Sequence, residues 1–489
     1  MLGRLLGFVR EILLSRMLGT GSQADIAVLV LTVPSFLLDL MIGGALGAAL
    51  VPAFVRSVGS GQGPQFYRRI ITFVGVGSCL ATLVFAVGSP AIVAAFAPGM
   101  AGEDRQRCAQ LLRIGFLSIP LTAMSAVAQA YLHAHGAFRM ASLGTAFYNA
   151  CLLCPLLLAD ISSLVPWLAI AVVAAALVRY MMIASAASAV GPLRSLQSVT
   201  APDPLLWRRY MQALIAGGGI VALPVIARSF ASTVGEGGIT IINLASKIIE
   251  LPLGSCLTVL SVVLLPKFSE LFTRGKESEK VAVSLFRRSI SITLAVALPI
   301  TAGLIGFGDR LATILFSGSV IDPQASVAIG SLIRLLACGV PALALVVLAQ
   351  AVLSAKRDMA SQVWASMLGM AGLVAGGIAC MVGAGLPAIA WGWVAGSWLM
   401  LAWHAACLRR HGVAFGSLIS RPANAFAVLS TAIVTWVAWS VASAAYVGDF
   451  AAVIIMAAGA ATASLIGAIV LGVFSRDGGT SGAGAETSI

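Results

Sequence analysis

The sequence predicts an all-α polytopic membrane protein with about fourteen transmembrane helices, arranged as two pseudo-symmetric six-helix lobes plus two C-terminal helices. Of the 489 residues, 60% are hydrophobic and 10% are charged, whereas soluble proteins carry about 25% charged residues. Uncharged runs such as residues 71–100 and 161–178 reach the length of about 20 residues that crosses a bilayer as a helix. These runs lack the alternation of barrel strands.

The net charge of +12 lies mainly in the short loops between these runs. Nineteen Lys and Arg residues fall in the loops and tail on one side of the membrane. Five fall on the opposite side: Arg16, Arg105, Arg107, Arg228 and Arg310. This asymmetry identifies the first side as cytoplasmic, so we expect no nucleic-acid partner. The C-terminus is then cytoplasmic and ends in a disordered tail, residues 475–489.

The segment 1–18 has two interpretations. Arg4, Gly7, Glu11 and Ser15 share one stripe of a helix, with apolar residues mostly opposite. Such a helix lies in the interface, or it spans the membrane with its polar stripe facing a water-filled cavity. In the second case there are fourteen spans instead of thirteen, and both termini are cytoplasmic.

An internal repeat divides the chain. Leu111-Leu112-Arg113 and Pro120 reappear in the second half, at a constant offset, as Leu332-Ile333-Arg334 and Pro341. The loop charges give both copies the same orientation, which predicts parallel halves around a central site. We expect an N-terminal lobe at 1–190, a C-terminal lobe at 206–407 and a further helix pair at 424–474.

Charged residues within apolar spans usually face a cavity or a partner. They are Arg4, Arg10, Glu11, Asp39, Arg179, Lys247 and Glu250. Lys247 and Glu250 are spaced i, i+3 and can pair on one helix face. A cavity with Arg4, Arg10 and Lys247 on its walls would be cationic and suited to a phosphate or pyrophosphate.

The sequence contains no pattern of residues that predicts an active site or a cofactor-binding site. Cys151 and Cys154 form a CxxC without further ligands nearby, so we expect no metal site. Two loops, at about 189–207 and 268–288, are the longest that we expect, and they lack the catalytic acids of a membrane glycosyltransferase.

Several motifs resemble the MurJ/MviN family of lipid II flippases, within the multidrug/oligosaccharidyl-lipid/polysaccharide exporter superfamily. They are Gly3-Arg4-Leu5-Leu6-Gly7-Phe8-Val9-Arg10-Glu11, Gly19-Thr20-Gly21, Ala24-Asp25, Leu50-Val51-Pro52-Ala53-Phe54 and Ala245-Ser246-Lys247 with Glu250-Leu251-Pro252-Leu253-Gly254. The sequence departs from that family at Leu38 and Gly43, where a basic residue and a glutamate are usual.

The resemblance implies a V-shaped transporter of the bacterial inner membrane, in which the helix pair at 424–474 would form a groove for the lipid tail. By alternating access it would move an undecaprenyl-pyrophosphate-linked peptidoglycan precursor, lipid II, from the cytoplasmic to the periplasmic leaflet. Arg4, Arg10 and Lys247 would bind the substrate, while Asp25, Asp39 and Glu250 would gate or form ion pairs. The implied partners are the lipid-linked pyrophosphate and membrane lipids, with other cell-wall synthesis proteins left open. The alternatives are another polysaccharide-lipid flippase or a drug/cation antiporter of the same superfamily.

Overall fold

The computed structural model describes residues 2–59, 61–190, 221–252, 258–316, 320–356 and 358–413, with a few residues between 432 and 440. These residues form helices and no strand, which confirms the all-α prediction. The expected helix pair at 424–474 and the expected loop at 189–207 lie almost entirely outside the described residues. The total of fourteen spans therefore stays a prediction.

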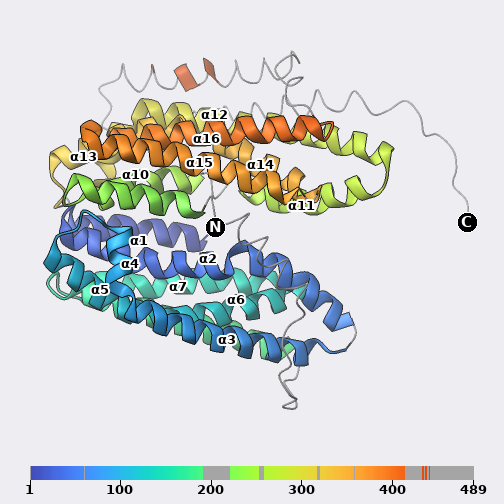
Figure 1. Cartoon of the computed structure of the whole chain (residues 1–489), viewed down its shortest axis with the longest axis horizontal. Coiled ribbons are helices and arrows are strands. Elements are labelled where there is room, and N and C mark those ends of the chain that lie inside the picture. Colours follow the sequence, from blue (N-terminus) through green and yellow to red (C-terminus); the bar gives the residue numbers. More distant parts are fainter. Residues whose placement is uncertain are drawn as a thin grey trace, which may run out of the picture.

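The first half of the chain forms one group of helices, coloured blue to cyan in Figure 1. They are α1 (Leu2–Leu18), α2 (Ser22–Gly59), α3 (Gly63–Val87), α4 (Ser89–Phe96), α5 (Gly102–Phe116), α6 (Ser118–Ala134), α7 (Phe138–Leu158) and α8 (Leu164–Val190). Their buried faces share one hydrophobic core. Near the end of α6 the stacked rings of Tyr67 and Tyr131 lie 4.6 Å apart, with Phe54 edge-on to Tyr131.

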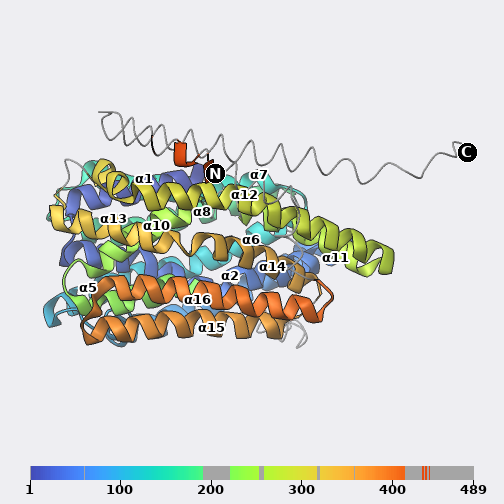
Figure 2. The same cartoon turned by 90° about the horizontal axis from the view of Figure 1, so that it is seen from above.

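The second half forms the other group, coloured green to orange. It comprises the helical segment Val221–Val234, α10 (Gly238–Pro252), α11 (Thr258–Thr273), α12 (Lys276–Phe316), α13 (Pro323–Ala337), α14 (Val340–Ala355), α15 (Met359–Ala379) and α16 (Gly385–Arg410). From above, α12 lies at one edge of this group and α15 with α16 at the other (Figure 2).

The two halves repeat the same packing. α5 and α6 pack against α2, as α13 and α14 pack against α10 and α11, and α7 packs against α8 as α15 packs against α16. The breaks match too, because the end of α5 at Phe116 and the end of α13 at Ala337 are equivalent positions of the sequence repeat. Pro120 and Pro341 each lie in the first turn beyond the break, where a missing N–H costs no helix bond. The α13–α14 pair bends by 46°.

Helix α15 approaches α16 closely because both helices present glycines. A Cβ on Gly372 would lie 2.6 Å from the Cα of Gly396, and a Cβ on Gly376 would lie 2.7 Å from the Cα of Gly392. Small residues four apart allow this backbone approach in membrane helices. The described residues include five helices long and apolar enough to cross a membrane, or six if the bent α13–α14 pair counts as one.

The prediction of a long loop at 268–288 is wrong, because this segment is almost entirely helical. Helix α11 continues to Thr273 and α12 begins at Lys276, so only Arg274 and Gly275 join them. Gly275 takes a φ of 110°, which suits a tight turn without a Cβ. Both helices continue through this charged region because their apolar faces pack together, with Phe268 of α11 against Phe286 of α12. Exposed ion pairs such as Lys280–Glu277, at 2.8 Å, add little.

Candidate central cavity and inter-half closure

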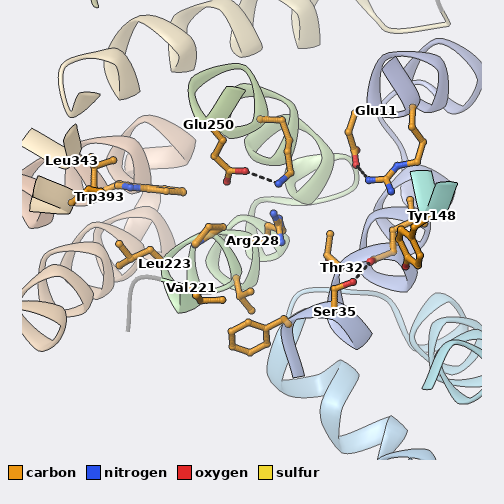
Figure 3. Close-up of a pocket in the computed structure, with 17 residues that line it drawn as sticks. Glu11, Thr32, Ser35, Tyr148, Val221, Leu223, Arg228, Glu250, Leu343 and Trp393 are labelled. Atoms are coloured by element: carbon orange, nitrogen blue, oxygen red, sulfur yellow. Dashed lines mark hydrogen bonds and ion pairs between the residues drawn. The ribbon is translucent and has the colours of Figure 1, made fainter. Parts of the chain in front are cut away.

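A cavity of about 470 Å³ lies where the two halves meet. The first half contributes residues of α1, α2 and α7, and the second contributes the segment Val221–Val234, α10, α14 and α16. Much of the wall is apolar, with Leu223, Leu343 and Trp393 on the second-half side (Figure 3). Thr32, Ser35 and Tyr148 supply hydroxyl groups on the first-half side, where Ser35 hydrogen-bonds Tyr148.

Arg10 and Glu11 reach the cavity from α1 as an ion pair. Arg10 also donates to Oδ1 of Asn149 on α7 at 3.3 Å. Glu11 is 3% exposed, and its second carboxylate oxygen accepts from Nδ2 of Asn243 on α10 at 3.2 Å. Helix α1 can approach α7 this closely because it has a glycine at the contact: a Cβ on Gly3 would lie 2.9 Å from the Thr145 side chain of α7.

Lys247 and Glu250 reach the cavity from α10. Nζ of Lys247 lies 2.6 Å from Oε2 of Glu250, and both side chains are about one third exposed (31% and 36%). Their i, i+3 spacing places them on one helix face. The ion pair that the sequence suggested is therefore present.

Arg228 is a third cation of the cavity, although the pattern of loop charges predicts it in an outer loop. It lies on the helical segment Val221–Val234 and is 5% exposed. Its charged neighbours are Glu250 and Glu11, and Figure 3 shows it between these two residues. Its Nε has no hydrogen-bond partner among the described residues.

The other predicted site residues lie elsewhere. Arg4 is exposed on α1 and is not part of the cavity wall. Asp39 belongs to α2, but its side chain lies outside the described residues. Within the described chain, no group of three or more His, Cys, Asp or Glu residues could hold a metal ion.

Asp25 joins the halves at one end of the molecule. This carboxylate, 4% exposed at the start of α2, accepts three hydrogen bonds at the N-terminus of α10. The donors are the N–H of Gly237 at 2.8 Å, the N–H of Thr240 at 2.8 Å and the Thr240 hydroxyl at 2.6 Å. A carboxylate here satisfies amides that have no partner within the helix and complements its dipole.

Further contacts surround Asp25 at the same end. The Gly99 N–H donates to Ser232 Oγ at 3.1 Å, and Ser229 Oγ donates to the Ala95 carbonyl at 2.9 Å. Arg16 Nε donates to the Leu315 carbonyl at 3.1 Å. We call these contacts, with those of Asp25, the inter-half clasp. The clasp closes the molecule at the end formed by the start of α2 and of α10.

Comparisons with known proteins agree with this architecture. A family model described as "Lipid II flippase MurJ" matches residues 14–468. A probable lipid II flippase MurJ of Rhizobium meliloti (strain 1021) is 26% identical over 357 residues, 70% of this chain and 66% of the relative. One from Rhizobium tropici is 27% identical over 376 residues, 73% of this chain and 69% of that relative. The matches thus span about two thirds of the relatives' length.

Solved structures show the same fold. The structure titled "Lipid II flippase MurJ, inward closed conformation" has a TM-score of 0.76 at 15% identity and covers 97% of both chains. An inward-facing multidrug resistance MATE family transporter has a TM-score of 0.69 at 15% identity, covering 84% of this chain and 94% of the other. Since the family model covers most of its length, the chain belongs to the lipid II flippase MurJ family.

Proposed function

We propose that this protein is a flippase that moves lipid II from the cytoplasmic to the periplasmic leaflet by alternating access. The observation that carries the proposal is a central cavity with cations from both halves, in a molecule closed at one end by the clasp. The likeness to relatives named lipid II flippase MurJ identifies the substrate class. The process is transport and not catalysis, and it calls for no cofactor.

The mechanism follows from where the contacts lie. The clasp joins the halves by polar contacts, whereas the apolar cores lie almost entirely within one half or the other. Among the described residues of these cores, Ile239 of α10 in the first core and Phe8 of α1 against the second are the apolar contacts that cross between the halves. Rocking of one half against the other breaks the clasp and leaves the cores intact. A pyrophosphate bound in the cavity would neutralise its cations, and the apolar wall would tolerate the attached lipid.

Conditional depletion tests the substrate. We expect cells depleted of the protein to accumulate lipid II and to lose its exposure at the outer leaflet, because the polar headgroup cannot cross the hydrocarbon core unaided. The measurement is mass spectrometry of lipid-linked intermediates, with accessibility to a membrane-impermeant reagent. Accumulation of a different polysaccharide-lipid, with lipid II unchanged, would refute the substrate and favour another branch of the superfamily.

The domain limits in this proposal are a lobe at 1–190, a lobe at 206–407, a helix pair at 424–474 that holds the lipid tail, and a tail at 475–489. The corresponding contacts of α2 with α6 and of α11 with α14 support the two lobes. In this proposal Arg10 and Lys247 bind the pyrophosphate, Glu250 is the ion-pair partner of Lys247, and Asp25 gates. Other cell-wall synthesis proteins are candidate partners.

We place both termini in the cytoplasm and the clasp at the periplasmic face of the inner membrane. The loop charges support this orientation, and α1 is a continuous helix from Leu2 to Leu18. We expect alkaline phosphatase to be inactive when fused before Met1 or after Ile489. Inserted at the exposed residue Gly102, before α5, it should be active. Activity of the fusion before Met1 would show that α1 does not span.

A further inference from the structure

The described cavity wall carries more cations than acids, and one cation, Arg228, has no ion-pair partner there. Arg10 is paired with Glu11 and Lys247 with Glu250. Arg228 is the remaining charged group of the cavity wall. Among the described residues of the cavity wall, three cations and two acids give a net charge of +1. Each acid is already paired with a cation other than Arg228.

Burial makes this charge costly. Arg228 is 5% exposed, and its Nε finds no hydrogen-bond partner among the described residues. A buried charge without a close partner destabilises the fold, and proteins usually pair or solvate it. Val221, Leu223 and Pro224, from the same segment, also line the cavity beside it. An apolar surrounding strengthens the attraction of the guanidinium for an anion that displaces water.

Arginine suits a pyrophosphate because its planar guanidinium presents five N–H donors and binds two oxygens at once. Arg10 and Lys247 are already paired with Glu11 and Glu250, so an anion that binds either cation has to compete with a carboxylate. Within the described part of the chain, Arg228 forms no such ion pair that an anion would have to displace. Arg228 is therefore the cation of the described cavity wall that an anion can bind without displacing an ion pair.

We propose that Arg228 is the primary anchor for the pyrophosphate of the transported lipid, and that Arg10 and Lys247 act after it. The identity of the lipid rests on the proposed function, but the anion site itself does not. Arg228 lies on the second half, whereas Arg10 lies on the first. An anion held by Arg228 is then within the cavity that Arg10 also lines, so binding would couple the halves.

The test uses the full chain in lipid nanodiscs and measures binding by calorimetry. The probes are geranylgeranyl pyrophosphate, the uncharged alcohol geranylgeraniol and inorganic pyrophosphate. We expect Arg228→Gln to weaken binding of the lipid pyrophosphate about tenfold or more, the range for loss of charge-assisted hydrogen bonds, and to leave the alcohol unaffected. Comparing the two pyrophosphates tells whether the site takes a lipid headgroup or a free anion.

Arg274→Gln is the matched control, because Arg274 is 64% exposed at the end of α11 and pairs with Glu270. It should bind every probe as the unaltered protein does. Thermal stability is the second readout. Removing a buried charge that has no direct ion pair should leave the melting temperature of Arg228→Gln unchanged or raise it. If Arg228 instead serves mainly as a structural counter-charge for its neighbours Glu11 and Glu250, the melting temperature should fall.

Equal binding of the lipid pyrophosphate by Arg228→Gln and the unaltered protein would overturn the inference. So would a lowered melting temperature with binding intact, or failure of the unaltered protein to bind either pyrophosphate. These outcomes are distinct from a failure of the proposed function. Should depletion leave lipid II unchanged while pyrophosphate binding still depends on Arg228, the anion site stands and only the transported lipid is misidentified.

Discussion

Replacing Asp25 by alanine is expected to open the clasped end of the molecule. The buried carboxylate accepts three hydrogen bonds from Gly237 and Thr240, and each hydrogen bond to a charged group is worth about 1.5–3 kcal/mol. Their loss leaves the backbone N–H groups of Gly237 and Thr240, at the N-terminus of α10, without these partners. The ratio of closed to open molecules at this end should fall by a factor of about ten or more, since about 1.4 kcal/mol corresponds to tenfold in an equilibrium constant.

Spin labels can measure this opening. Glu103, in the first turn of α5, and Glu236, just before α10, are exposed at the clasped end on opposite halves. With both residues changed to labelled cysteine and the native cysteines removed, double electron–electron resonance reports the distance between the halves. Asp25→Ala should add a longer-distance population.

Asp322→Ala is the matched control for that experiment. Asp322 precedes α13 at the same end, but it is exposed and its side chain makes no capping hydrogen bond. Its distance distribution should equal that of the labelled protein without the substitution. An unchanged distribution in Asp25→Ala would mean that the remaining contacts, such as Gly99–Ser232 and Arg16–Leu315, hold the end closed without the carboxylate.

The sequence was sufficient to predict the class of fold and some of the residues that line the cavity. Hydropathy and the repeat predicted apolar helices in two matching halves, because each depends on local composition. Arg10 and Lys247 were identified because a charge within an apolar run stands out. The i, i+3 spacing then identified Glu250 as the partner of Lys247.

Arg228 was missed because charge counting treats a basic residue near the end of a span as part of a loop. Its burial depends on packing between segments far apart in the chain, since its charged neighbours Glu11 and Glu250 lie on α1 and α10. An apolar run that continues on both sides of Arg228, from Val221 to Ala231, was the signal that could have identified it.

The pairing of Arg10 with Glu11 was also missed. Adjacent residues of a helix point about 100° apart, so they are not expected to face each other. Here both long side chains turn toward the same cavity, held by Asn149 on one side and Asn243 on the other. Arg4 was expected in the same cavity from the polar character of α1, but it lies on an exposed part of that helix.

The ion pair of Arg10 complicates the simplest test of its role. Arg10→Ala should abolish transport, but it also leaves Glu11 buried without its cation. Breaking a buried pair from one side destabilises a protein by about 3–5 kcal/mol. Loss of activity in this variant would therefore fit a binding role and a purely structural role equally well.

The double variant Arg10→Met, Glu11→Gln separates the two roles. It removes both charges, keeps similar volumes and leaves the net charge of the cavity unchanged. Replacing a buried ion pair by neutral residues is often close to neutral for stability. We expect a melting temperature near that of the unaltered protein, normal membrane insertion and no rescue of growth in depleted cells, because an arginine that binds pyrophosphate is missing.

The pair Arg274 and Glu270, at the end of α11, provides the control, since it has the same chemistry but is exposed, at 64% and 55%. Changing Arg274 to Met and Glu270 to Gln should alter neither growth nor stability, because exposed pairs contribute about 0–1 kcal/mol. If the Arg10→Met, Glu11→Gln protein supports normal growth, Arg10 only balances Glu11. The anion must then be held by Arg228 and Lys247, both on the second half of the molecule.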